Sequence, residues 1–288
     1  MDTAKATKAA AQTAPADTQA TKAAAQTAPA DTKATKPADT KATKAAAQTA
    51  PAPRRLVIIP TYNEIENIEA ICRAVFALEE GYHILVIDDG SPDGTAVQVQ
   101  KLQNEFPDRL FLICRSGKLG LGTAYITGFK WALEQGYDYM TEMDADFSHD
   151  PKDLPRLSEC CEKGGADVAI GSRYADGVSV VNWPIGRIIM SYYASVYTRT
   201  VLGTGIMDST AGFVCWSAKV LRSIDLNAVK MKGYGFQIEM KYTAKKKGFC
   251  IKEVPVIFVN RKAGTSKMSG SIFGEAFWGV IGLRFRKF

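Results

Sequence analysis

Two aspartates one residue apart end an apolar stretch near the middle of the chain. Asp144 and Asp146 stand in the segment "MDADFSHD", directly after residues that read as a β-strand. Strands disfavour aspartate, and a buried carboxylate is costly unless a cation compensates it. Mg²⁺ characteristically combines one or two carboxylates with substrate phosphates, and strand spacing would point both side chains the same way. We therefore expect Mg²⁺ or Mn²⁺ and a diphosphate here, with Ser148 and His149 within reach. The alternative is a solvated loop in which Asp150 caps the next helix.

Two further polar segments follow predicted strands earlier in the chain. In "PTYNE", Tyr62 offers an aromatic face and Glu64 can accept hydrogen bonds from a base or a ribose. In "DDGSPDGT", turn chemistry explains the glycines but not the adjacent carboxylates of Asp88 and Asp89. Such an acceptor pair suits a nucleotide, as the acidic residue of a dinucleotide fold suits a ribose. The alternative for "PTYNE" is a helix start capped by Asn63.

Basic residues that suit phosphates are concentrated in the second half of the chain. Arg173 lies in "GSRY", Arg187 in "NWPIGR", and Arg261 and Lys267 in "NRKAGTSK". Arginine matches phosphate geometry well, although scattered surface arginines are common. The glycine-rich "KLGLGTA" would let a phosphate approach a helix N-terminus, or it is simply a tight turn. "GYGFQIEM" is either a functional segment or a helix start.

The elements that must position these residues alternate between strands and helices. Apolar runs predict strands at 56–60, 82–90, 110–114, 137–146 and 166–174, with helices between them at 64–78, 91–106 and 120–136. This alternation predicts an α/β protein with a Rossmann-like, mostly parallel sheet flanked by helices. Ligands of such sheets bind at the carboxyl ends of the strands, where the polar segments fall. A nucleotide-binding dehydrogenase is excluded, since "PTYNE" replaces the required GxGxxG.

The chain divides by composition at Arg54. Residues 1–53 repeat "TKAAAQTAPADT" and contain no Leu, Ile, Val or aromatic residue, so we expect a disordered tail without catalytic residues. Residues 54–288 are expected to form a single catalytic domain. The net charge of +6 suits phosphates or a membrane surface but is too weak to indicate nucleic-acid binding. The six cysteines lack zinc spacing, which indicates reduced thiols in a cytoplasmic protein.

The C-terminal segment, at about 269–288, has the pattern of an amphipathic helix that could lie at a membrane interface. No stretch of the chain reads as a signal peptide or is long and apolar enough to span a bilayer. The alternative is a helix that packs on the domain. The apolar side expected for the helix at about 269–288 consists of Ile272, Phe273, Phe277, Trp278, Ile281 and Phe285. Arg284, Arg286 and Lys287 would suit anionic headgroups.

The ordered set of motifs resembles one enzyme family. "PTYNE", "DDGSPDGT", "MDAD", "GSRY", "NWP…R…S", "GFQIEM" and "EVPVIF…R…G.SK" follow one another as in family 2 glycosyltransferases with the GT-A fold. More closely, they resemble dolichol-phosphate (polyprenol-phosphate) mannose synthases, and the likeness runs from about Arg54 to at least Lys267. The resemblance assigns nucleoside binding to Pro60, Tyr62, Glu64, Asp88, Asp89 and Asp144. It assigns metal binding to Asp144 and Asp146, and acceptor or diphosphate binding to Arg173, Arg187, Ser191, Arg261 and Lys267, with Arg187, Asp144 and Asp146 as catalytic residues.

The activity that the resemblance implies is inverting transfer of mannose from GDP-mannose to dolichyl or polyprenyl phosphate. Some members of the family place Gln where this chain has Ser148, and others have Ser there as well. Several members continue into membrane helices, and this chain resembles the compact type, peripheral on the cytoplasmic face of a membrane. A small membrane partner subunit is conceivable. Two alternatives remain open, namely transfer of glucose or another sugar from a UDP-sugar, and a non-catalytic partner subunit that keeps the fold.

Overall fold

A computed structural model describes residues 52–260 and 271–286, with the side chains of the last helix described from Phe277 onward. Most of the tail predicted at 1–53 lies outside the described residues, and so do Arg261 and Lys267. The domain boundary at Arg54, the tail and the roles of these two basic residues therefore stay predictions.

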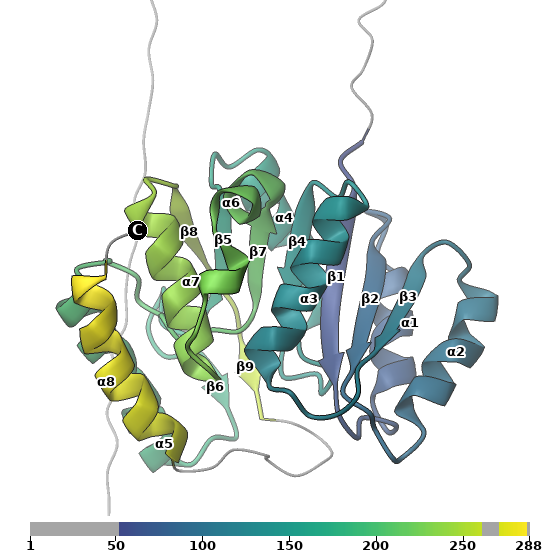
Figure 1. Ribbon diagram of the computed structural model, residues 1–288, viewed down its shortest axis with the longest axis horizontal. Helices are drawn as coiled ribbons and strands as arrows, with labels where there is room; N and C mark the ends of the chain where they lie inside the picture. Colours follow the sequence, from purple (N-terminus) through teal and green to yellow (C-terminus); the bar gives the residue numbers. More distant parts are fainter. Residues whose placement is uncertain (1–51, 261–270, 287–288) are drawn as a thin grey trace, which may run out of the picture. The chain divides into compact units, whose positions relative to one another are not determined.

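The described chain is built around one mixed sheet (Figure 1). The strand order is β3-β2-β1-β4-β7-β5-β8, and every neighbouring pair is parallel except the two pairs made by β7. Its strands are β1 (Arg55–Thr61), β2 (His83–Asp88), β3 (Leu110–Cys114), β4 (Tyr139–Glu142), β5 (Val168–Ser172), β7 (Val214–Ser217) and β8 (Ile251–Pro255). A small second sheet pairs β6 (Val180–Val181) with β9 (Phe258–Val259). The expected mostly parallel α/β sheet is confirmed, and the antiparallel β7 is an addition.

Helices cover both faces of the sheet (Figure 1). The helices are α1 (Ile68–Phe76), α2 (Thr95–Glu105), α3 (Leu121–Glu134), α4 (Leu154–Glu162), α5 (Ile185–Leu202), α6 (Ala218–Ser223), α7 (Tyr234–Lys246) and α8 (Ser271–Phe285), with short 3₁₀ turns η1 (Pro151–Asp153) and η2 (Leu226–Ala228). Asp150 does cap η1, because its side chain accepts a hydrogen bond from the Lys152 backbone N–H.

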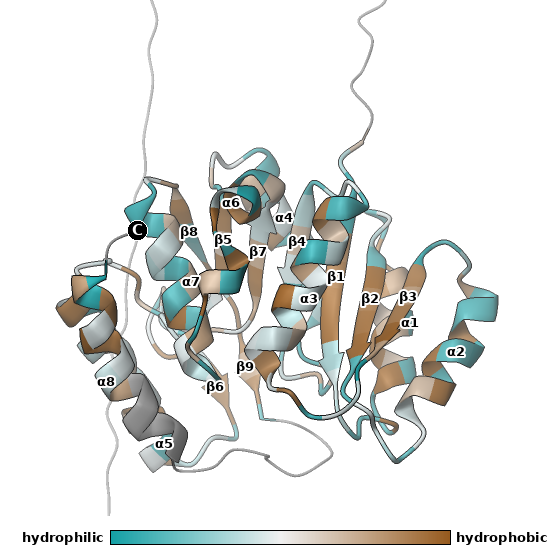
Figure 2. Ribbon diagram, in the orientation of Figure 1, coloured by the Kyte–Doolittle hydropathy of each residue, from teal (hydrophilic) through white to brown (hydrophobic). Residues whose placement is uncertain are grey.

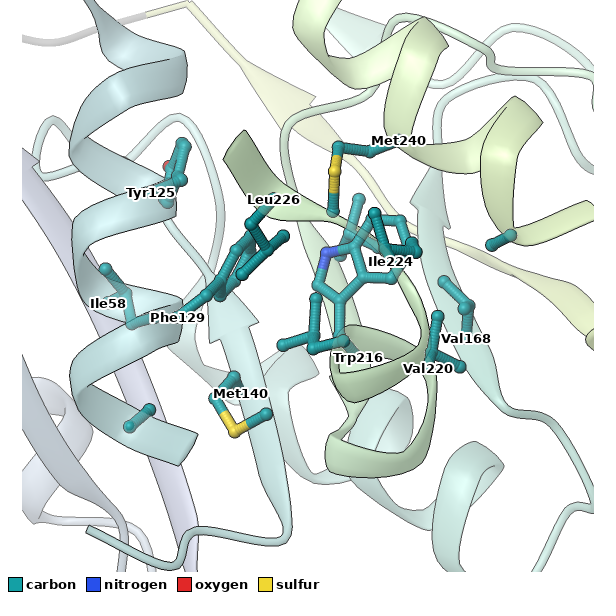
Figure 3. Packing of buried hydrophobic residues seen from close by; sticks show 14 of the residues in the cluster. Ile58, Tyr125, Phe129, Met140, Val168, Trp216, Val220, Ile224, Leu226 and Met240 are labelled. Carbon is teal, nitrogen blue, oxygen red and sulfur yellow. The ribbon is translucent and has the colours of Figure 1, made fainter. Parts of the chain in front are cut away.

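The strands are apolar on both sides because each side faces a layer of helices. Along β1, Leu56 and Ile58 join the cluster under α3, α6 and α7, while Val57 and Ile59 join the cluster under α1, α2 and α4. Figure 2 shows the strands as hydrophobic and the outer turns of α2 as hydrophilic. Figure 3 shows Trp216 of β7 packed among residues that include Phe129, Ile224 and Met240. This two-sided core therefore supports the strands on both faces.

Local boundaries differ from expectation at two strand ends. The strand expected at 137–146 ends at Glu142, so Asp144 and Asp146 lie in a loop and not at strand spacing. Pro60 does not stop the first strand; it pairs with Ile87 of β2, at a point where the pairing with β4 has already ended. Proline is tolerated where a strand has an unpaired edge.

The helix expected at 64–78 begins only at Ile68, preceded by Asn67 rather than by Asn63. Asn63 adopts a left-handed backbone conformation, with a φ of 57°. It therefore lies in the turn that leads from β1 to α1 and does not cap the helix.

The C-terminal helix α8 lies beside α5 and α7 (Figure 1). Its Val280 and Leu283 are buried against the small cluster that also contains Leu202, while Trp278 and Phe285 are 71% and 81% exposed. The helix therefore packs on the domain and still presents aromatic side chains to solvent.

Within the described ranges, no helix combines the length and the apolar character needed to cross a membrane.

Candidate active site

A pocket opens where the parallel strands end, as expected for such a sheet. The loop after β4 contributes Asp144 and Asp146, and the end of β5 contributes Gly171 and Arg173. Because β7 is antiparallel, the residues before it reach the same edge, and Thr210, Ala211 and Gly212 line the pocket too. The wall is completed by Trp183, Arg187, Tyr234, Gln237, Phe258 and Asn260, together with Leu121, Ser148, His149 and Gly233.

The loop after β4 holds its two aspartates by contacts within the loop. The Ser148 backbone N–H donates to Asp146 Oδ1 at 3.0 Å. The Asp144 backbone N–H donates to Nδ1 of His149 at 3.4 Å, and the ring of His149 stacks on Phe213. Burial lowers the pKa of His149 to about 4, although Asp146 opposes this effect. The ring is therefore neutral at pH 7, and it fixes the loop without adding charge.

Arg173 is buried and paired with a carboxylate that the sequence did not single out. Its Nε and Nη2 donate to Asp208 at 2.7 and 2.6 Å, and Nη2 also donates to Thr210 Oγ1 at 2.8 Å. Burial alone would raise the pKa of Asp208, but the charge and hydrogen bonds of Arg173 lower it. Arg173 thus lines the pocket with much of its charge balanced by Asp208.

Arg187 is held differently. Its guanidinium lies 4.0 Å from the centre of the Trp183 ring, and Nη1 donates to the neutral Asn260 side chain at 3.2 Å. A stacked guanidinium with a neutral partner keeps its positive charge available to an anion. Ser191 lies one turn further along α5 and is not among the pocket-lining residues.

Apart from Asp144, the expected nucleotide-binding residues lie at the ends of β1 and β2, at the same edge of the sheet as the pocket but not in its lining. Asp88 accepts hydrogen bonds from Thr61 Oγ1 at 2.8 Å and from the Ser91 hydroxyl at 2.6 Å. Asp89 forms an ion pair with Arg115 at 2.5 Å. The two carboxylates therefore order the turn after β2.

Tyr62 and Glu64 lie in the turn that follows β1. The ammonium group of Lys118, from the glycine-rich segment, lies 5.2 Å from the centre of the Tyr62 ring. Glu64 accepts from the Asn67 side chain at 3.0 Å, and its backbone N–H donates to Thr95 Oγ1. The structure thus brings "PTYNE", "DDGSPDGT" and "KLGLGTA" to one edge of the sheet.

The buried carboxyl group of Glu142, beneath the pocket, was not predicted from the sequence. Glu142 is fully buried and accepts from Trp216 Nε1 at 2.6 Å and from the Gln237 side-chain amide. Burial raises the pKa of Glu142 to about 7. The signal was a glutamate inside an apolar strand, but its partners come from β7 and α7, which local sequence patterns do not place.

The donor set at the pocket suits a hard divalent cation. Asp144 and Asp146 bring two carboxylates to one wall, and Arg187 brings a cation to the same pocket. Among the described residues no group of three or more His, Cys, Asp or Glu side chains is arranged to hold a metal. Mg²⁺ rarely occupies a cage made only of protein ligands and instead combines one or two carboxylates with phosphates. The two aspartates therefore fit a cation that binds together with a diphosphate.

A pocket with an acidic loop at the carboxyl edge of a mostly parallel sheet is typical of ligand-binding α/β enzymes, and comparison with known proteins identifies the family. The model of the family "Glycosyl transferase family 2" matches residues 56–224. The chain belongs to glycosyl transferase family 2, and it is a glycosyltransferase.

Two curated relatives cover most of the chain. It is 49% identical over 234 residues to "Polyprenol monophosphomannose synthase" of Mycolicibacterium smegmatis, covering 80% of this chain and 88% of that protein. It is 47% identical over 243 residues to "Undecaprenyl-phosphate mannosyltransferase" of Micrococcus luteus, covering 81% and 98%. The expected resemblance to polyprenol-phosphate mannose synthases is confirmed.

Solved structures agree on the fold. Glucosyl-3-phosphoglycerate synthase from Mycobacterium tuberculosis, in complex with phosphoglyceric acid, matches with a TM-score of 0.59 at 18% identity, covering 80% of each chain. The same enzyme in complex with Mn²⁺ and UDP-glucose matches with a TM-score of 0.55 at 18% identity, covering 78% of this chain and 75% of that one. These neighbours confirm the GT-A-type architecture.

Proposed function

We propose that this protein transfers mannose from GDP-mannose to dolichyl or another polyprenyl phosphate, with inversion at the anomeric carbon. The observation that carries the proposal is the pocket in which Asp144 and Asp146 face the same space as Arg187. Such a site can hold two phosphates, one bridged through a cation and one held by an arginine. The relatives named as polyprenol-phosphate and undecaprenyl-phosphate mannosyltransferases support the sugar and the acceptor class.

The reaction needs positioning more than it needs a base. An acceptor phosphate is already anionic near pH 7, so its oxygen can attack without losing a proton. Arg187, stacked on Trp183, is placed to hold one phosphate against the repulsion of the other. Attack from the face opposite the leaving diphosphate gives a β-mannosyl phosphate from an α-linked donor. Arg173, tied to Asp208, keeps the wall beside Arg187 in place.

Asp144 and Asp146 are the residues that would hold Mg²⁺ or Mn²⁺, and such an ion would supply positive charge beside the departing diphosphate. The turns after β1 and β2 are the proposed nucleoside site, through Pro60, Tyr62, Glu64 and the carboxylates of Asp88 and Asp89. Asp89 is already paired with Arg115, so the nucleoside would contact the Asp89–Arg115 ion pair and not a free carboxylate. Arg173, Ser191, Arg261 and Lys267 remain proposed phosphate contacts.

The acceptor is a lipid, and we propose that an apolar surface on α5 and α8 rests on the membrane that carries it. Ile185, Ile189 and Tyr193 of α5 are 77%, 51% and 64% exposed, and Trp278 of α8 is 71% exposed. The two helices are in contact where Tyr197 of α5 stacks on Phe277 of α8, with 4.7 Å between the ring centroids. Arg187 lies in the first turn of α5, the helix that carries Ile185, Ile189 and Tyr193, so the phosphate of a membrane-embedded lipid can reach the pocket. These exposed residues support our proposal of a peripheral protein on the cytoplasmic face of a membrane, with or without a small membrane partner.

A transfer assay tests the proposed function. Purified protein, Mn²⁺ or Mg²⁺, a polyprenyl phosphate and detergent are mixed with labelled GDP-mannose or, separately, with labelled UDP-glucose. We expect label to enter the organic phase from GDP-mannose only. Label that enters only from UDP-glucose would support the alternative donor. Absence of transfer from both donors, with GDP-mannose still bound, would support the alternative of a non-catalytic subunit.

A further inference from the structure

The amide of Gln237 in the first turn of α7 is buried and incompletely hydrogen-bonded. Its side chain lines the pocket, and the residue is 2% exposed. The Nε2 group donates to Glu142, whereas Oε1 has no hydrogen-bond partner among the residues that the structure describes. A buried acceptor left unpaired costs on the order of 1–3 kcal/mol. An unpaired acceptor at a pocket wall therefore indicates a ligand that donates to it.

The orientation of this amide is fixed from beneath. Glu142 also accepts from Trp216 Nε1 at 2.6 Å, and Trp216 is anchored in the core between α3 and α7 (Figure 3). The hydrogen bond that Gln237 Nε2 donates to Glu142 turns the NH₂ group toward Glu142 and the amide oxygen away from it. The Trp216–Glu142–Gln237 chain thus presents an acceptor, and not a donor, to the pocket.

The chemistry of an amide oxygen decides which part of the substrates it can meet. It accepts hydrogen bonds and gains nothing from a phosphate oxygen, which is itself an acceptor. Both substrates of the proposed reaction meet the pocket through phosphates. The ribose hydroxyls of the donor belong to the proposed nucleoside site at the turns after β1 and β2, so the transferred sugar is the part that brings hydroxyl donors to the pocket. We propose that Gln237 Oε1 accepts a hydrogen bond from a hydroxyl of the donor sugar and thereby selects that sugar, with Glu142 as the positioning residue. This inference rests on the proposed function.

A site built to bond a substrate hydroxyl discriminates strongly against the analogue that lacks it, because the buried protein group is then left unpaired. The inference therefore makes a prediction about donor analogues and not only about overall rate. If Gln237 accepts a hydrogen bond from one sugar hydroxyl, the loss in kcat/KM caused by replacing Gln237 and the loss caused by removing that hydroxyl from the donor must not add. Each change abolishes the same contact.

The experiment compares kcat/KM of the wild-type protein, Gln237→Met and Glu142→Gln on GDP-mannose and on its monodeoxy analogues, each lacking one sugar hydroxyl. Gln100→Met, an exposed position on α2, is the control substitution. Inhibition by GDP, which lacks the sugar, reports whether each variant is folded and keeps its nucleotide site. In Glu142→Gln the new amide can turn its NH₂ toward Gln237 and reverse the presented group, so this variant tests orientation without touching the pocket wall.

We expect Gln237→Met to lose about ten- to a hundredfold on GDP-mannose and to match the wild-type protein on one monodeoxy donor. Glu142→Gln should show the same selective loss, with GDP inhibition unchanged in both variants. The inference is overturned if the loss is equal on all donors, if GDP inhibition weakens in parallel, or if the variant mainly needs more Mn²⁺, which would make Gln237 a metal ligand. Transfer by the wild-type protein from UDP-glucose alone would overturn the proposal that GDP-mannose is the donor. The same comparison with monodeoxy analogues of UDP-glucose would then decide the role of Gln237. Wild-type transfer from neither donor would overturn both proposals.

Discussion

At the scale of single residues, two aspartates in the loop after β4 have different roles. Asp146 lines the pocket, whereas Asp150 caps η1 with a hydrogen bond from the Lys152 N–H at 3.0 Å. The two residues lie in one loop and have the same side chain. Substituting each by alanine therefore separates the chemistry of the loop from its folding.

Asp146→Ala should reduce mannosyl transfer by about 10²- to 10³-fold, because a charge that stabilises the leaving diphosphate is lost. Asp150→Ala should keep transfer near the wild-type rate and lose about 1 kcal/mol of the free energy of unfolding, as expected for a lost cap. Initial rates and urea titrations measure both effects. Near-normal turnover in Asp146→Ala would refute the metal assignment.

The buried pair of Arg173 and Asp208 makes a second prediction. Replacing Asp208 by Asn leaves a buried guanidinium without its counter-charge, and we expect a loss of about 3–5 kcal/mol in the free energy of unfolding at pH 7. Because the pKa of Asp208 is lowered in the folded protein, its contribution is fully present above the ordinary carboxyl pKa of about 4 and is lost as the pH falls through the folded value. The difference in the free energy of unfolding between the wild-type protein and Asp208→Asn should therefore become smaller at acidic pH.

Urea unfolding of both proteins from pH 7 down to about pH 3 measures this gap. Asp176→Asn, at an exposed position, is the matched control and should change little at any pH. A gap for Asp208→Asn that stays constant across the range would show that the carboxylate charge is not what stabilises Arg173.

At the scale of elements, α3 depends on a glycine for its distance from the sheet. A Cβ at Gly128 would lie 2.7 Å from Cγ2 of Ile58, which is fully buried in β1. Gly128→Ala should therefore lower the free energy of unfolding by about 1–2 kcal/mol, because overpacking outweighs the gain in helix propensity. Gly186→Ala in α5, where a Cβ meets nothing within 4 Å, should be neutral or slightly stabilising. Thermal unfolding measures both, and a stabilised Gly128→Ala would contradict this packing.

Elements also show how far the sequence alone reaches. The order of strands and helices and the edge that holds "PTYNE", "DDGSPDGT" and "MDAD" could be predicted, because apolar runs and turn chemistry are local signals. The antiparallel β7 could not, since its direction is set by pairing with β4 and β5. The partners of Arg173 and Glu142 were missed for the same reason: Asp208 and Gln237 lie far along the chain and meet them only after folding.

At the scale of the whole molecule, the exposed apolar surface of α5 and α8 should decide access to the lipid acceptor. Trp278→Ser should weaken binding to phospholipid vesicles by about tenfold, because less apolar surface enters the interface. Val97→Ser, which also replaces an exposed apolar side chain by serine, at a 54% exposed position on α2, is the control. Vesicle co-sedimentation measures both variants. Equal effects of the two substitutions would place the membrane contact elsewhere.

The central claim is that the pocket between the aspartates and Arg187 joins the anomeric carbon of a GDP-linked mannose to a polyprenyl phosphate from the opposite face. The most direct test is to isolate the lipid product formed by the wild-type protein from GDP-mannose and to determine its anomeric configuration by NMR. We predict polyprenyl β-mannosyl phosphate. An α-linked product, or a product in which the sugar is not attached through phosphate, would contradict the account.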